Sequence, residues 1–280
     1  MQIIHSIDEM QTLSENLRKQ GRSIGFVPTM GFLHEGHLSL VDLLTDRTDT
    51  SILSIFVNPT QFSEGEDLEK YPHDLERDLK LCQERKLDIV FIPKRKEMYS
   101  VHHSTLIEEE SLSPKLCGLS RPTHFQGVTT VCAKLFNICQ PNIVVLGQKD
   151  AQQVVVLKRM IKDLNFPIEV IVGDIFREKD GLAMSSRNSY LSLEQREDAL
   201  LLNRSLRAGR DLQSRGISNI DQIKEEVISM LRQGKSIRLD YVEVVNRETM
   251  EPIQEIEPNQ SIIVLAVWID KIRLIDNLNL

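Results

Sequence analysis

IGFVPTMGFLHEGHL, residues 24–38, joins an apolar run to an amphipathic one across two glycines and two histidines. Residues 24–27 are typical of a short buried strand, and the apolar spacing at residues 38–44 is typical of a following helix. At such a turn the first N–H groups of the helix lack partners and carry about half a positive charge, so anions bind there. Gly31 and Gly36 let the backbone approach a ligand closely. The stretch therefore predicts a phosphate-binding turn.

The two histidines of this turn favour the same interpretation. His34 and His37 are three residues apart, so on a first helical turn they share a face and can both donate to one phosphate group. Two other interpretations stay open at this point, a pair of metal ligands and a pair of surface histidines. A metal site needs further ligands, and no additional Cys/His cluster in the sequence completes one.

Composition and charge restrict the function classes. The 280 residues suffice for one large domain or two smaller ones. A net charge of −7 argues against a nucleic-acid partner, because phosphate contacts need clustered Lys and Arg. No apolar run approaches the roughly 18 residues of a membrane span, no basic leader precedes an apolar core, and the four cysteines lack CxxC spacing. We therefore expect a cytoplasmic protein with neither a nucleic-acid nor a membrane partner.

Short apolar runs alternate with helical patterns over the first 176 residues, which predicts an α/β domain with a doubly wound (Rossmann-like) parallel sheet. The predicted strands lie at residues 24–27, 52–57, 89–92, 143–146 and 168–172. Residues 177–280 instead predict a smaller α+β domain, because two helices precede consecutive strands. Those helices lie at residues 193–214 and 220–233, and the strands at residues 239–245, 262–267 and 272–275.

Polar residues follow the predicted strands, where α/β sheets bind their ligands. Asn58 and Gln61 offer uncharged amides beside the ring of Phe62, and amides can hold a small hydroxy acid without an ion pair. After the strand at residues 143–146, Lys149 can reach a phosphate as a mobile point charge. A turn with exposed amides and an ordinary surface lysine remain alternatives for these two segments.

Two further segments complete the chemistry. Gly147 permits close approach to a nucleotide, and Asp150 suits either ribose hydroxyls or the cap of the next helix. At the expected domain junction, Ser185 and Ser186 precede Arg187, and two hydroxyls beside a permanent cation can bind a triphosphate as charge moves onto its leaving group. A flexible linker between the domains would also be rich in Ser and Gly.

Taken together, these segments resemble the HxGH nucleotidyltransferase superfamily, through His34-Glu35-Gly36-His37 and Met184-Ser185-Ser186-Arg187. They resemble more closely the pantoate-beta-alanine ligase family. The segments that carry this closer resemblance are residues 28–38, 56–62, 121–128, 147–153 and 180–188. The resemblance implies two steps in one site. Pantoate attacks the α-phosphate of ATP to give pantoyl adenylate and pyrophosphate, and the amine of β-alanine then displaces AMP to give pantothenate.

The resemblance also implies roles for individual residues. The catalytic residues would be His37, as proton donor, with His34, Lys149 and Arg187. The ATP-binding residues would be Met30, Gly31, Phe32, Leu33, His34, Glu35, Gly36, His37, Gly147, Gln148, Lys149, Asp150, Phe176, Met184, Ser185, Ser186 and Arg187. Pantoate would be bound by Gln61, Gln153, Asn58 and His124, and β-alanine beside Gln61. Magnesium would accompany ATP, with Asp78 as the candidate protein ligand. The family implies a homodimer whose residues 1–176 bind nucleotide and pantoate and whose residues 177–280 close over ATP.

Three other functions remain open from the sequence. Another adenylyltransferase of the superfamily would need a cationic site for a phosphorylated acceptor, whereas this chain offers Asn58 and Gln61. A class I aminoacyl-tRNA synthetase is disfavoured by the acidic balance and by the lack of a large additional RNA-binding domain. A regulatory nucleotide-binding module without catalysis would keep ATP affinity and show no turnover.

Overall fold

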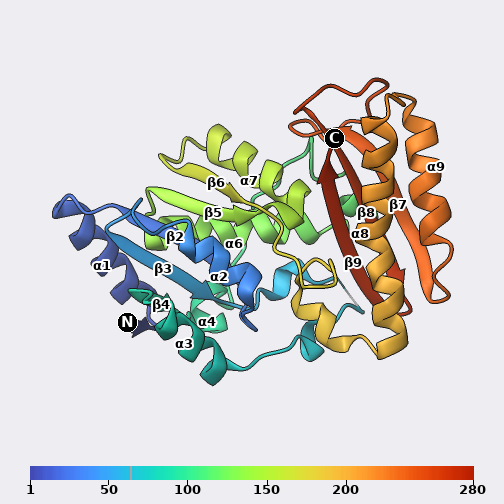
Figure 1. The fold of residues 1–280 in the computed structure, drawn as a ribbon. Coiled ribbons are helices and arrows are strands. Elements are labelled where there is room, and N and C mark those ends of the chain that lie inside the picture. The colour runs from blue at the N-terminus through green and yellow to red at the C-terminus, as the bar shows by residue number, and fades with distance from the viewer. Residues whose placement is uncertain (64) are drawn as a thin grey trace.

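Two β-sheets organise the chain, which the computed structural model describes over residues 1–63 and 65–280 (Figure 1). The first sheet is parallel and has the strand order β1-β4-β3-β2-β5-β6. Its strands are β1 (Gln2–Ile4), β2 (Ile24–Thr29), β3 (Thr50–Ile55), β4 (Ile89–Phe91), β5 (Ile143–Gly147) and β6 (Glu169–Gly173). The second sheet is antiparallel, in the order β7 (Ile237–Asn246), β8 (Ser261–Ile269) and β9 (Ile272–Asn279).

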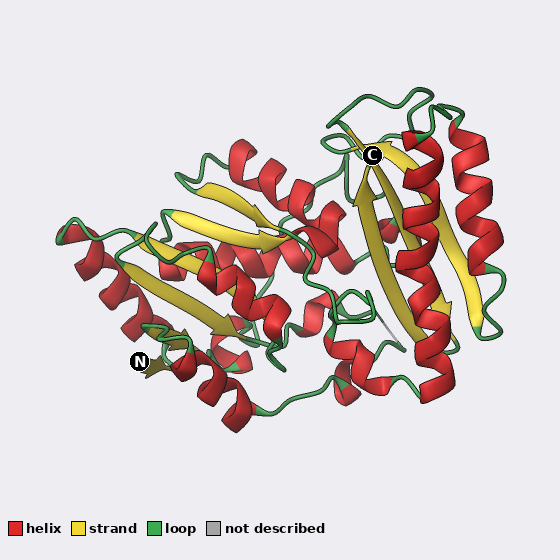
Figure 2. Ribbon diagram, in the orientation of Figure 1, coloured by secondary structure: helices red, strands yellow, loops and turns green. Residues whose placement is uncertain are grey.

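Helices cover both faces of the parallel sheet (Figure 2). Alternate strand residues point to opposite faces, so Phe26 packs in one core and its neighbour Val27 in the other. The core of Phe26 takes in the buried sides of α1 (Ile7–Lys19), α6 (His124–Cys139) and α7 (Ala151–Asp163). That of Val27 takes in α2 (Glu35–Asp42) and α3 (Leu75–Glu84). Two short helices, α4 (Arg95–Met98) and α5 (Cys117–Ser120), lie in the long connection between β4 and α6.

The order in which strands are added to the sheet reverses at β2. From β2 the chain builds β3 and β4 on one side and then returns to place β5 and β6 on the other. In open α/β sheets the crevice beyond the carboxyl ends of the strands at such a reversal is the ligand site. The turn after β2 and the segment after β5 therefore face one another across the place where this topology favours a ligand.

The C-terminal part packs two long helices on the antiparallel sheet. α8 (Leu193–Ser214) begins with a capping box, in which Ser192 and Gln195 each bond the backbone of the other. α8 and α9 (Ile220–Leu231) bury one side of each against the sheet, around Leu202, Val227 and Leu265. Within the described ranges no helix combines the length and apolarity that a membrane span requires.

The predicted fold class is confirmed, with one addition. The five expected strands of the parallel sheet are present, and α8 covers the residues that the sequence indicates. The added strand is β1, which pairs with β4 at the edge of the sheet and is not among the strands expected from the sequence. β1 has three residues, of which only Ile4 is buried, so it carries no readable alternation.

Candidate functional site

A cavity of about 240 Å³ lies beyond the carboxyl ends of β2 and β5. Its wall comes mainly from four separate segments, which are the turn after β2, residues 121–135 around and after the start of α6, the residues around Gly147, and the loop at residues 174–187. Most residues that the sequence predicts as site residues line it. They are Met30, His34, Gly36, His37, Gln61, His124, Gly147, Lys149, Asp150, Gln153, Phe176, Met184, Ser185, Ser186 and Arg187.

The turn after β2 is held in its shape from outside the cavity. Gly31 has a φ of 85°, and a Cβ there would lie 2.9 Å from Ile55 Cγ2, so this position requires glycine. The Asp78 carboxylate accepts 2.7 Å hydrogen bonds from the backbone N–H groups of Phe32 and Leu33. Asp78 is buried, and desolvation raises the pKa of its carboxyl group. The structure therefore uses Asp78, expected as a magnesium ligand, to fasten the turn, and does not bring it to the cavity.

His34 and His37 stack at the N-terminus of α2, with ring centroids 4.0 Å apart. Burial, aided by the charge of Lys149, lowers the pKa of His37 to about 4. Burial and the neighbouring His37 lower the pKa of His34 to about 2. The backbone N–H of His34 donates to His37 Nδ1 at 3.4 Å, so a neutral His37 carries its proton on Nε2. The free protein therefore presents uncharged imidazoles to the cavity.

Gln61 ends a short 3₁₀ helix, η1 (Pro59–Gln61), that sits against α6. Asn58 fixes this contact, because its side chain donates to the carbonyl of Gly127 at 3.0 Å and accepts from Thr60 and Tyr99. A Cβ on Gly127 would lie 2.2 Å from the Thr60 carbonyl oxygen, so the close approach requires glycine. Asn58 is fully buried and lies outside the cavity wall. It was expected to bind pantoate, and the structure places it beneath Gln61 instead.

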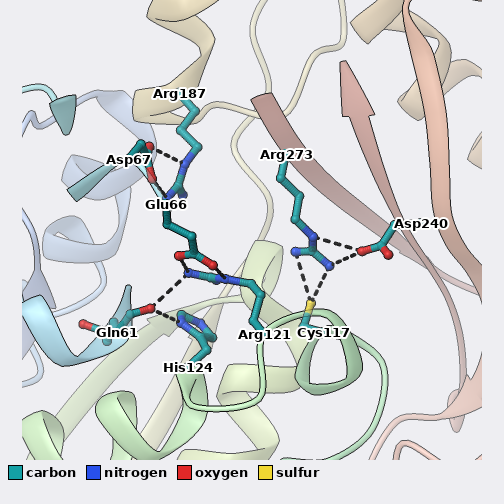
Figure 3. Close-up of polar contacts among 9 residues, drawn as sticks. All are labelled: Gln61, Glu66, Asp67, Cys117, Arg121, His124, Arg187, Asp240 and Arg273. Carbon is teal, nitrogen blue, oxygen red and sulfur yellow. Dashed lines mark hydrogen bonds and ion pairs between the residues drawn. The ribbon is translucent and has the colours of Figure 1, made fainter. Parts of the chain in front are cut away.

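His124 and Arg121 hold Gln61 from the other side. His124 Nδ1 donates to the Gln61 carbonyl at 2.9 Å, and Arg121 Nη2 donates to the same oxygen at 3.1 Å (Figure 3). Burial, followed by the charge of Arg121, lowers the pKa of His124 to about 3. Arg121 lines the cavity but was not among the expected site residues, although it begins one of the segments that carry the family resemblance.

Two carboxylates on the loop after η1 hold the cavity arginines (Figure 3). Glu66 accepts two 2.7 Å hydrogen bonds from Arg121. Asp67 accepts from Arg187 Nε at 2.9 Å and from Nη2 at 2.8 Å. Both pairs are largely shielded from solvent. In the free protein the two guanidinium groups therefore have anionic partners supplied by the chain itself.

The short helix α5, which precedes Arg121, is tied to the C-terminal sheet (Figure 3). Arg273 on β9 bonds Asp240 on β7 at 2.8 and 3.0 Å and approaches Cys117 Sγ at 3.5 Å. Ser120 donates to the same Asp240 carboxylate at 2.8 Å. The C-terminal sheet thus contacts the segment that presents Arg121 to the cavity.

Other expected members of the ATP site do not line the cavity wall. Leu33 is fully buried in the core, Glu35 pairs with Arg85 at the surface, and Gln148 turns toward Asn277. The expected site residues outside the cavity wall are Gly31, Phe32, Leu33, Glu35, Gln148, Asn58 and Asp78. Phe176 does line the cavity, where its side chain is 40% exposed.

Known proteins share this architecture over the whole chain. The family model described as Pantoate-beta-alanine ligase matches residues 2–279. Pantothenate synthetase of Pseudothermotoga lettingae is 51% identical over 277 residues, which are 99% of this chain and 98% of the relative. The crystal structure of pantothenate synthetase from Thermus thermophilus matches with a TM-score of 0.94 and 40% identity, covering 100% of this chain and 99% of that one. Pantoate-beta-alanine ligase from Francisella tularensis, solved in complex with beta-gamma ATP and beta-alanine, gives a TM-score of 0.82 and 35% identity, covering 100% and 97%.

Proposed function

This chain belongs to the pantoate-beta-alanine ligase family. On that premise we propose that it carries out a two-step ligation in this cavity, with the residue roles given below. In the first step a carboxylate oxygen of pantoate attacks the α-phosphorus of ATP. The bond from that phosphorus to the bridging oxygen breaks, and pyrophosphate leaves. In the second step the amine of β-alanine attacks the acyl carbon, loses a proton, and expels AMP as the amide forms. Both steps need positioning and charge stabilisation rather than a covalent enzyme nucleophile.

ATP lies between the segment around Gly147 and the loop that carries Arg187, with its phosphates toward α2. The observation that supports this most strongly is that His37 and Lys149 line one cavity together with Ser185 and Arg187, although these residues come from three separate segments. Lys149 supplies an ammonium group on a flexible side chain, and Arg187 supplies a planar guanidinium group. This pair suits a triphosphate whose charge shifts toward the leaving pyrophosphate.

His34 and His37 are neutral hydrogen-bond donors when the phosphates first arrive. The negative charge of the triphosphate raises the pKa of an adjacent imidazole. This change would allow His37, which has a pKa of about 4 in the free protein, to hold and release a proton once ATP is bound. The fixed Nδ1 bond directs its other nitrogen, Nε2, to the ligand. In this proposal His37 donates that proton to an oxygen of the leaving pyrophosphate.

Pantoate lies against Gln61, Gln153 and His124. The Gln61 backbone is already held by His124 and Arg121, so its side-chain amide is not needed to anchor the turn. Uncharged amides orient a carboxylate without stabilising it so strongly that attack becomes slow. Asn58 supports Gln61 indirectly, because it holds η1 against α6. β-Alanine enters beside Gln61 once pyrophosphate has left.

Magnesium arrives with ATP as part of the substrate. Across residues 1–63 and 65–280, no three His, Cys, Asp or Glu side chains converge into a metal cage. Mg²⁺ commonly keeps several waters and binds substrate phosphates with one or two carboxylates. Asp150 and Asp174 line the cavity and suit that limited part, which is to steady the hydrated ion. Magnesium bound in this way neutralises triphosphate charge.

Three further properties belong to the same proposal. Residues 1–176 form the domain that binds nucleotide and pantoate, and residues 177–280 form the one that closes over ATP. The protein is a homodimer, which size-exclusion chromatography with light scattering tests. It works in the cytoplasm, where ATP is available and where four unpaired cysteines stay reduced.

The placement of ATP is tested by calorimetric titration with the nucleotide. Lys149→Met is expected to weaken ATP binding about tenfold, since a charged partner of a phosphate is lost. Lys158→Met is the matched control, because Lys158 is exposed on α7 and does not line the cavity. Equal ATP affinity in the two variants would overturn the placement.

A further inference from the structure

Two adjacent residues of β9, Asp276 and Asn277, are each only 2% exposed and do not line the cavity described above. They lie in the last strand of the chain, where the sequence carries no motif that points to the site. The two side chains contact two different segments that line the cavity, namely the segment after β5 and the loop that carries Arg187.

Asn277 holds the segment after β5. Its side-chain Nδ2 donates to the carbonyl oxygens of Gln148 and Lys149, both at 3.0 Å. Its Oδ1 accepts from Gln148 Nε2 at 3.1 Å. One amide on the C-terminal sheet therefore fixes the backbone from which the Lys149 side chain departs.

Asp276 holds the start of the loop that carries Arg187. Its carboxylate accepts from Arg177 Nη1 at 2.7 Å and from Nη2 at 2.9 Å. Arg177 also donates to the Gly181 carbonyl and forms a β-bridge with Ala183, directly before Met184. The Asp276–Arg177 pair thus fixes the base of this loop.

The two contacts are joined within β9, because Asp276 Oδ1 accepts from the backbone N–H of Asn277 at 2.8 Å. We propose that Asp276 and Asn277 are positioning residues that set the separation between Lys149 and Arg187, so that ATP phosphates meet both cations at once. This inference rests on the proposed placement of ATP between the two segments. A misplacement of 1 Å in a site of this kind can lower the rate by about a hundredfold.

Asn277→Asp tests the inference with a side chain of nearly the same size and shape. The substitution places an acceptor where a donor now faces two carbonyl oxygens, so it repels the Lys149 backbone that Asn277 holds in the unmodified protein. We expect KM for ATP to rise by roughly ten- to a hundredfold, while KM for pantoate changes by less than about threefold. Because burial raises the pKa of a new carboxyl group, the defect should shrink as the pH falls and the carboxyl donates again.

Asn279→Asp is the matched control, since Asn279 is an exposed residue of the same strand. The thermal midpoint of each variant is measured beside the kinetics. A folded Asn277→Asp enzyme with unchanged KM for ATP would overturn the inference. An equal rise in KM for ATP and in KM for pantoate would overturn it as well. If Asn277→Asp does not fold, Asp276→Asn provides the same comparison, because it removes the charge that holds Arg177. An unchanged KM for ATP in Lys149→Met would instead place the failure in the proposed ATP site.

Discussion

Acidification from pH 7 to pH 5 should destabilise the free protein through the imidazoles that the cavity encloses. Burial lowers the pKa values of His34, His37 and His124 to about 2, 4 and 3, whereas an unfolded chain titrates near 6.5. The unfolded state therefore takes up protons first as the pH falls below 6.5, and the free energy of unfolding decreases. At 1.36 kcal/mol per pKa unit, the 1.5 units down to pH 5 amount to about 2 kcal/mol for each histidine.

His37→Gln isolates one of these contributions. Glutamine puts an uncharged, hydrogen-bonding amide in place of the imidazole and does not titrate, so the loss of stability between pH 7 and pH 5 should shrink by about 2 kcal/mol. Urea denaturation at the two pH values measures that difference. His102→Gln, at an exposed position, is the control and should leave the difference unchanged. If His37→Gln loses as much stability as the unmodified protein, the imidazole of His37 is not held neutral by burial.

Three further substitutions test other parts of the site. Asp67→Asn frees Arg187 from its carboxylate partner, so calorimetry should show ATP binding about fivefold tighter; weaker binding would mean that Asp67 orients the arginine for ATP. Gln61→Ala should raise KM for pantoate about tenfold and leave that for ATP nearly unchanged, and the reverse pattern would contradict the proposed pocket. Gly127→Ala places a Cβ 2.2 Å from the Thr60 carbonyl oxygen, which should lower stability by about 1–3 kcal/mol in thermal denaturation and also weaken pantoate binding; an unchanged melting curve would refute the tight packing.

Local pattern was sufficient for the parts of the site that neighbouring residues build. The turn with His34 and His37 follows a buried strand and opens a helix, and the periodicity of a few residues indicates both elements. The same holds for Lys149, which lies two residues after the end of β5. Because the carboxyl ends of β2 and β5 meet where the strand order reverses, these segments converge once the sheet forms.

The sequence did not indicate which way a polar side chain near a strand end would point. Asn58 and Asp78 have the residue types of ligand-binding groups, yet in the structure their oxygens accept from backbone and side-chain donors of the chain itself. A polar residue near a strand end can face the ligand or anchor the turn, and composition does not distinguish the two.

Long-range partners were equally hidden. Asn277 and Gln148 are 129 positions apart, and Asp276 and Arg177 are 99 positions apart. Nothing local in β9 indicates that its end reaches the cavity loops, since its alternating residues also suit an ordinary sheet. Only the packing of β9 against the segment after β5 and against the loop that begins near Arg177 brings these groups together.

The most direct measurement follows pyrophosphate release with ATP, magnesium and D-pantoate, with and without β-alanine, and identifies the nucleotide and amide products. We expect pantoate-dependent pyrophosphate release without β-alanine as the adenylate forms, and AMP with pantothenate only when both substrates are present. Absence of pantoate-dependent pyrophosphate from folded, ATP-binding protein would contradict the proposed function.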